Sequence, residues 1–216
     1  MTKRGRLITF EGGEGVGKST QIKALAATLA AAGVDVVTTR EPGGTPGAEA
    51  IRALVTEGSA DRWSPLTETL LFLAARQDHV ERLIQPALAE GRWVLCDRFI
   101  DSTRVYQGIA GTLGLELIDR LHRTIFEEIR PDLTLLLDMP VEAGLARRQA
   151  AGEGNRFEQK VMDFHHAVRN GFFELASSEP ERFALIDAAQ PLETVTASIA
   201  DVVATRLMPD LNERAG

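Results

Sequence analysis

The chain has 216 residues, of which 44% are hydrophobic and 25% are charged. This composition provides enough apolar side chains for a core and excludes an intrinsically disordered protein. Acidic residues outnumber basic ones by 31 to 24, giving a formal net charge of −7. Because an acidic chain repels a phosphate backbone, we expect no nucleic-acid partner.

Two further absences narrow the class of protein. A single cysteine excludes a disulfide framework and a cysteine-based zinc site. No apolar run approaches the ~18 residues of a membrane span, and the N-terminal residues leave no room for a signal sequence. We therefore expect a cytoplasmic protein without a membrane partner.

Short apolar runs alternate with helical patterns along the chain. The apolar runs predict strands at residues 6–10, 34–39, 93–97, 133–138 and 182–187. The patterns between them predict helices at residues 18–32, 49–57, 65–90, 115–129, 141–150, 159–177 and 192–207. Several strands are continuously apolar, as in a sheet that is buried on both faces. We predict an α/β fold in which residues 1–216 form a single domain around a five-stranded parallel sheet, with helices on both faces.

A glycine-rich segment between the first strand and the first helix fits the pattern G-x-x-x-x-G-K-[ST]. Its glycines allow successive N–H groups to point at a phosphate, and the helix that follows adds its positive end. We expect Lys18 to reach the β- and γ-phosphates of ATP, and the Ser19 hydroxyl to ligate Mg²⁺. The predicted nucleotide-binding residues are Gly12, Gly13, Glu14, Gly15, Val16, Gly17, Lys18, Ser19 and Thr20.

The type of P-loop protein follows from motifs that the sequence lacks. Neither the DxxG nor the NKxD motif of a GTPase switch occurs, and the chain is short for a translocating motor. A small phosphotransferase remains, and such an enzyme needs a second pocket for the acceptor and cations for the transferring group.

Candidate acceptor residues follow the other strands. Asp97 and Arg98 end one strand, where the carboxylate can hold the Mg²⁺ shell and the guanidinium can grip a phosphate. Phe72 and Arg76 lie four residues apart on one helix face, which suits stacking and edge hydrogen bonds to a planar base. Taken singly, these residues also fit a strand-end ion pair, a core phenylalanine and a snorkelling arginine, and the segment REPGGT at 40–45 also fits a plain loop.

Taken in order, the segments FEGGEGVGKST, TREPGGTPGAE, LLFLAAR, VLCDRFIDSTRVYQG, RPDLTLLLD and DAAQPLETV resemble bacterial thymidylate kinase. The resemblance covers residues 7–203. It implies a P-loop nucleoside-monophosphate-kinase fold that works as a homodimer and transfers the γ-phosphoryl group of ATP to dTMP. A kinase of another pyrimidine nucleoside monophosphate is the alternative.

The resemblance also implies roles for residues that contact the nucleoside of dTMP. Phe72 is expected to stack on thymine, while Arg76 hydrogen-bonds its edge. Thr103 and Gln107 are expected to meet the base as well. Tyr106 is expected to pack under the deoxyribose, where it disfavours a ribose 2′-hydroxyl.

A second set of implied roles concerns the phosphates. Arg98 and Arg52 are expected to bind the dTMP phosphate, Glu14 to lie near the acceptor sugar and the metal, and Glu41 to shape the same pocket.

The polar segment at residues 147–157 is expected to form a lid. One subtype of the resembled family carries a catalytic arginine in its P-loop, and the other supplies it from the lid. The P-loop here contains no arginine, so we expect the lid to provide the cation, with Arg156 favoured over Arg148.

Overall fold

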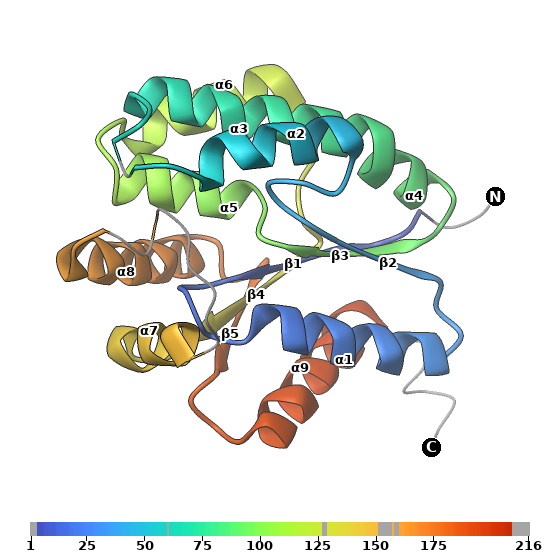
Figure 1. Cartoon of the computed structure of the whole chain (residues 1–216). Coiled ribbons are helices and arrows are strands. Elements are labelled where there is room, and N and C mark those ends of the chain that lie inside the picture. Colours follow the sequence, from blue (N-terminus) through green and yellow to red (C-terminus); the bar gives the residue numbers. More distant parts are fainter. Residues whose placement is uncertain (1–3, 60, 127–128, 151–156, 158–159, 209–216) are drawn as a thin grey trace.

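The computed structural model describes residues 4–59, 61–126, 129–150, 157 and 160–208 (Figure 1). Its centre is a five-stranded parallel sheet with the order β2-β3-β1-β4-β5. The strands are β1 (Leu7–Glu11), β2 (Val36–Arg40), β3 (Trp93–Asp97), β4 (Leu133–Asp138) and β5 (Phe183–Asp187). The predicted parallel sheet is confirmed, with strand bounds that move by two residues at most.

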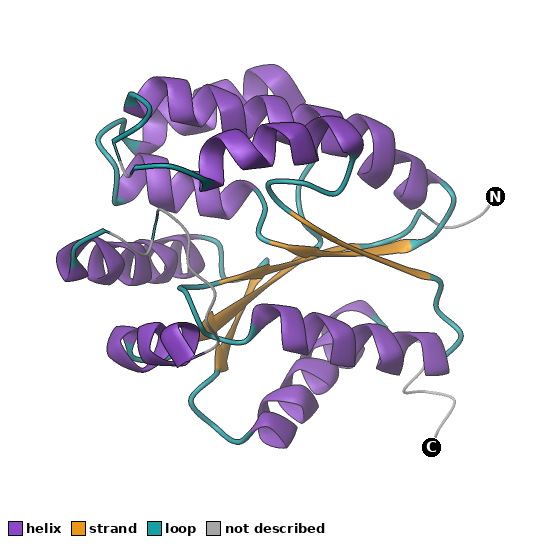
Figure 2. Cartoon of the chain, in the orientation of Figure 1, coloured by secondary structure: helices purple, strands orange, loops and turns teal. Residues whose placement is uncertain are grey.

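Helices cover both faces of this sheet (Figure 2). In chain order they are α1 (Lys18–Ala31), α2 (Pro46–Thr56), α3 (Pro65–His79), η1 (Val80–Ile84), α4 (Gln85–Ala89), α5 (Ile100–Thr103), η2 (Arg104–Ile109), α6 (Leu115–Phe126), α7 (Val141–Ala150), α8 (Met162–Ser178) and α9 (Leu192–Leu207). In the view of Figure 1, α1 and α9 lie below the sheet, whereas α2, α3 and α6 lie above it. Among the described residues, no helix has the length and apolar character needed to cross a bilayer.

The continuous apolar strands are explained by a core on each face. Leu7 packs in the layer that contains α3 and α4, while its neighbours Ile8 and Phe10 pack in the layer that contains α1 and α9. Successive side chains of a strand point to opposite faces, so a strand between two helical layers must be apolar throughout.

Several helical regions differ from the sequence prediction, and α8 begins at Met162 instead of residue 159. The helix predicted at residues 65–90 is interrupted by the π-helical segment η1. Helix α2 begins three residues earlier than expected, because Thr45 accepts a hydrogen bond from the Ala48 N–H and caps a helix that has proline at its first position. The helical segments α5 and η2 were not predicted at all, and they carry much of the site described next.

Candidate active site

A cavity of about 500 Å³ opens where β1, β2 and β3 end. In parallel α/β sheets, ligands bind beyond these carboxyl ends. The described residues that line it include seven cationic side chains and three acidic ones, although the chain as a whole is acidic. The local excess of positive charge suits ligands that carry phosphate groups.

Most of the predicted site residues meet in this cavity. They are Glu14, Gly15, Val16, Gly17, Lys18, Ser19, Thr20, Glu41, Arg52, Phe72, Arg76, Asp97, Arg98, Thr103, Tyr106, Gln107 and Arg148. Gly12 and Gly13 lie in the same loop behind the lining, where their carbonyl oxygens accept hydrogen bonds from Lys18. Arg156 and most of the predicted lid lie outside the described residues.

The P-loop wraps the start of α1 in the way that its glycines predict. Gly12 has a φ of 132°, and a Cβ atom there would lie 2.2 Å from the carbonyl oxygen of Leu137, so only glycine fits. Lys18 Nζ donates to the carbonyl oxygens of Gly12 and Gly13 at 3.2 and 2.8 Å. Burial, reinforced by Arg98, lowers the pKa of Lys18 to about 8. An anion beside this buried ammonium would stabilise its charged form.

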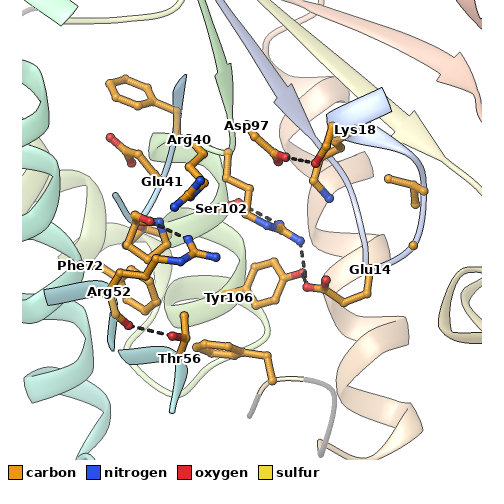
Figure 3. Close-up of a pocket in the computed structure, with 18 of the residues that line it drawn as sticks. Glu14, Lys18, Arg40, Glu41, Arg52, Thr56, Phe72, Asp97, Ser102 and Tyr106 are labelled. Atoms are coloured by element: carbon orange, nitrogen blue, oxygen red, sulfur yellow. Dashed lines mark hydrogen bonds and ion pairs between the residues drawn. The ribbon is translucent and has the colours of Figure 1, made fainter. Parts of the chain in front are cut away.

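Ser19 and Asp97 are the residues predicted to hold Mg²⁺. The Ser19 hydroxyl donates to Asp97 Oδ2 at 2.8 Å, so side-chain oxygens from two different elements meet here. Figure 3 shows Asp97 beside Lys18. Hydroxyl and carboxylate oxygens are donors that Mg²⁺ accepts, with the remaining positions filled by phosphate and water. Among the described residues, no group of three or more histidine, cysteine or acidic side chains forms a metal site by itself.

Arg98 reaches across the cavity to the P-loop. Its Nη1 atom donates to the Gly12 carbonyl and to Ser102 Oγ, both at 3.1 Å, and its Nη2 atom donates to Glu14 Oε1 at 2.8 Å. Although burial favours a neutral carboxyl, Arg98 and Lys18 hold the pKa of Glu14 below its ordinary value. Figure 3 shows the Tyr106 hydroxyl pointing toward the Glu14 carboxylate, to which it donates at 3.2 Å.

Arg76 is buried, and every nitrogen of its guanidinium has a partner. Nε donates to Glu41 Oε2 at 2.6 Å, and Nη2 donates to the Phe99 carbonyl at 3.0 Å. Nη1 donates to Thr103 Oγ1 at 3.1 Å and to His122 Nε2 at 2.9 Å. This network holds the guanidinium in one orientation at the wall of the cavity.

His122 completes that network as a neutral acceptor. Burial, reinforced by Arg76, lowers the pKa of His122 to about 2, so its ring stays uncharged. On the other side of the network, His79 Nδ1 lies 3.1 Å from Glu41 Oε1, and His79 is fully buried. Histidines on both sides therefore support the Arg76–Glu41 ion pair.

Aromatic side chains form a second wall. The Phe72 and Tyr106 rings lie 6.1 and 6.0 Å from the ring of Phe157, measured between centroids. Flat apolar rings beside an arginine provide both a stacking surface and hydrogen-bond donors for a planar base. Gln107 is buried nearby, where its amide Nε2 donates to Glu68 at 2.9 Å.

Arg52 and Arg40 stand on the opposite side from the P-loop. Arg52 Nη1 donates to the Pro42 carbonyl at 2.6 Å. Burial and the nearby Arg40 lower the pKa of Arg52, which shows that cations crowd this part of the cavity. A bound anion would relieve that crowding.

Comparison with known proteins identifies the family of this chain. The family model for thymidylate kinase matches residues 10–199. The chain belongs to the thymidylate kinase family. Thymidylate kinase of Caulobacter vibrioides is 56% identical over 94% of this chain and 98% of its own length. Thymidylate kinase of Rhizorhabdus wittichii is 54% identical over 94% of this chain and 99% of its own length.

Solved structures agree with the sequence relatives. The crystal structure of thymidylate kinase from Ehrlichia chaffeensis superposes with a TM-score of 0.77 at 33% identity, covering 93% of this chain and 99% of that one. The resemblance to bacterial thymidylate kinase and the P-loop NTPase fold are therefore confirmed. As a member of this family, the chain is an ATP-dependent nucleoside-monophosphate kinase.

The thymidylate kinase motifs did not reveal every residue of the site. Glu11, Ser102 and His122 each contact an arginine of the cavity or its supporting segment, and no contact or chemical role was assigned to any of them from the sequence. A signal was present for Glu11, which is the one charged residue of strand β1. His122 lies on the buried side of the strongly amphipathic helix α6, where a polar residue needs a partner.

Proposed function

We propose that this chain transfers the γ-phosphoryl group of ATP to dTMP and thereby gives ADP and dTDP, a step toward dTTP. The observation that carries this proposal is the arrangement of one cavity, in which a P-loop faces a base-sized pocket lined by Phe72, Arg76 and Tyr106. Arg98 lies between them and contacts Glu14 of the P-loop. A phosphoryl group passing from donor to acceptor would cross this point.

On the donor side, the chain's own residues bind and orient the triphosphate. The backbone of residues 12–17 cradles the phosphates, and Lys18 exchanges the Gly12 and Gly13 carbonyls for phosphate oxygens. Ser19 and Asp97 are the residues that would hold Mg²⁺. When bound, Mg²⁺ neutralises the negative charge that two phosphate groups bring together.

On the acceptor side, Phe72 stacks on thymine while Arg76, Thr103 and Gln107 address its edge. Arg76 hydrogen-bonds to Thr103, so the two side chains present a joint polar edge. Tyr106 is buried and fills the space where a ribose 2′-hydroxyl would lie. Selection by filled space is the means available to a site that must reject an added hydroxyl.

The acceptor phosphate is assigned to Arg98 and Arg52, with Glu14 and Glu41 shaping the pocket. Both arginines line the cavity, where they add to its excess of positive charge. Arg148 also lines the cavity, on the last turn of α7, and its charge acts on Glu14. Arg148 is therefore the candidate for the cation of the transferring group within the described residues, while Arg156 stays a prediction.

The experiment that tests the proposal is an acceptor panel. ADP formation is followed at fixed ATP and Mg²⁺ with dTMP, dUMP, UMP, dCMP, dGMP, AMP and no acceptor. Strong preference for dTMP, weaker use of dUMP and little use of UMP are expected.

Equal use of UMP would contradict the assigned base and sugar contacts and would favour the alternative, a kinase of another pyrimidine monophosphate. Lack of stimulation by every acceptor would contradict a kinase and indicate a nucleotide-binding switch.

The homodimer implied by the resemblance is part of the proposal. Helices α2, α3 and α6, which lie together above the sheet in Figure 1, expose four large apolar side chains. They are Leu54, Leu66, Leu70 and Ile125. A second copy covering this layer would remove these side chains from water. Leu70→Asp should shift the sedimentation coefficient from dimer to monomer, whereas unchanged sedimentation would contradict this face.

Two further interpretations from the sequence stay predictions. The organisation of residues 1–216 as a single domain is supported by the one sheet that joins all five described strands. The cytoplasmic location is consistent with a requirement for nucleotide substrates.

A further inference from the structure

Arg98 stands out by its backbone as well as by its side chain. Its φ is 66°, and among the described residues no other non-glycine residue has a positive φ. This left-handed conformation is unfavourable for a side chain with a Cβ atom, so the surrounding structure must hold it. The position directly follows Asp97 at the end of β3.

Glu11 provides the contacts that hold this turn. The residue ends β1 and is fully buried. Its Oε1 atom accepts hydrogen bonds from the Phe99 N–H at 2.8 Å and the Ser102 N–H at 3.1 Å. These two N–H groups lie on the segment that directly follows Arg98, so one carboxylate fixes the chain on the far side of the strained residue.

The same carboxylate also acts on the Arg98 side chain through Ser102. Ser102 Oγ donates to Glu11 Oε2 at 2.7 Å and accepts from Arg98 Nη1 at 3.1 Å. The Ser102 hydroxyl has one proton. Arg98 can only donate and an ionised carboxylate can only accept, so the hydroxyl must donate its proton to Glu11. The relay therefore runs in one direction, from the guanidinium to Ser102 and from Ser102 to Glu11.

We propose that Glu11 and Ser102 are positioning residues that orient the Arg98 guanidinium for the acceptor phosphate. This inference rests on the proposed function and deepens it. Arg98 Nη2 now donates to Glu14, whereas Nη1 is held by Ser102 and the Gly12 carbonyl. When an acceptor phosphate takes the place of Glu14 on Nη2, the contacts of Nη1 keep the guanidinium in the plane that the phosphate must meet.

The charge state of Glu11 fits this role. Burial and the nearby Asp101 raise the pKa of Glu11 to about 7, while Arg98, Ser102 and the Phe99 N–H favour the ionised form. All three hydrogen bonds that reach Glu11 donate to it, so the relay is complete when the carboxylate is ionised.

The test is a double-mutant cycle on kcat/KM for dTMP. Ser102→Ala removes the relay hydroxyl, leaves the buried Glu11 in place and changes a half-buried residue. In the parent enzyme it should raise the KM for dTMP about tenfold, the effect of one hydrogen bond to a charged group. The KM for ATP should stay unchanged, whereas the melting temperature should fall by a few degrees because the buried Glu11 Oε2 loses the hydrogen bond from Ser102. In an Arg98→Ala background, Ser102→Ala should have no further effect on kcat/KM.

Thr9→Val is the matched control, because Thr9 is buried on the same strand as Glu11 and hydrogen-bonds to Thr134 instead. It should leave the KM for dTMP unchanged.

Three results would overturn the proposal. The first is an unchanged KM for dTMP in Ser102→Ala. The second is the same loss of kcat/KM from Ser102→Ala in the parent and in the Arg98→Ala background. The third is a rise in the KM for dTMP in Thr9→Val that equals the rise in Ser102→Ala. A parent enzyme that dTMP does not stimulate would overturn the proposed function as well, so the two failures are distinguishable.

Discussion

The two halves of the cavity are built in different ways. The donor half is one continuous stretch of backbone, in which Lys18 contacts the carbonyls of its own loop. The acceptor half is built from side chains of several elements, and Arg76 alone joins Glu41, Thr103 and His122. The donor half is therefore free to exchange its contacts for phosphate, whereas the acceptor half is already organised around a fixed arginine.

This difference has a physical consequence. Substitution of a buried arginine whose hydrogen bonds are all made is strongly destabilising, because it leaves the arginine's partner buried and unpaired. Lys18 donates its hydrogen bonds to backbone carbonyls, and its removal leaves Glu14 still paired with Arg98. Substitutions in the donor half should therefore affect catalysis, and substitutions in the acceptor half should affect both binding and folding.

Lys18→Ala is expected to have the largest effect. Loss of the ammonium removes charge stabilisation from the transferring group, so kcat should fall about 10³-fold. The melting temperature and dTMP binding should remain close to those of the parent. Steady-state kinetics and thermal denaturation measure these quantities, and a Lys18→Ala protein that loses dTMP binding would contradict the separation of the two halves.

Arg76→Ala should act on both properties. It leaves Glu41 buried without its ion-pair partner, so the free energy of unfolding should fall by about 3 kcal/mol. Urea denaturation measures this loss, and the KM for dTMP should rise in parallel. Arg82→Ala is the matched control in the same helical run, because its ion pair with Asp78 is exposed and should matter little.

Glu11→Gln tests the raised pKa by way of stability. The pKa of Glu11 is about 7 in the folded protein, whereas the ordinary pKa of a glutamate is 4.5. Between pH 4.5 and pH 7, Glu11 therefore keeps its proton in the folded protein and loses it in the unfolded chain. Parent stability should therefore fall as pH rises from 5.5 to 8, by about 2 kcal/mol relative to Glu11→Gln. Urea denaturation across this range gives the difference, and a constant difference would contradict the raised pKa.

Tyr106 should show the smallest effect when only its hydroxyl is removed. Tyr106→Phe loses one hydrogen bond to Glu14, worth about 1 kcal/mol, and keeps the ring that fills the sugar pocket. Tyr106→Ala empties the pocket, so the ratio of kcat/KM for dUMP to that for UMP should fall about tenfold. Equal ratios in Tyr106→Ala and the parent would show that the ring does not select the sugar.

The comparison also explains what the sequence could predict. The P-loop was readable because its residues are contiguous and glycine is required where φ is positive, as at Gly12. Phe72 and Arg76 were found because helical spacing places them on one face. The roles of Ser102 and His122 were not predicted, because they depend on contacts between segments that are distant in the sequence.

The parallel sheet was predictable and the helical segment after β3 was not. Alternating apolar strands and helices predicted the parallel sheet, since burial on both faces leaves a clear pattern. The segment that forms α5 and η2 is short, and Glu11 of strand β1 accepts hydrogen bonds from the Phe99 and Ser102 N–H groups where that segment begins. A contact between such distant residues cannot be predicted from the local sequence.

Calorimetric titration of dTMP in the absence of ATP and Mg²⁺ tests the central claim most directly. An acceptor half that is organised by its own side chains should bind dTMP without the donor. The parent and Lys18→Ala should give the same Kd, and Arg76→Lys should lose binding because an ammonium cannot reproduce the contacts of the guanidinium. Binding that requires ATP, or an equal loss in Lys18→Ala and Arg76→Lys, would contradict the account.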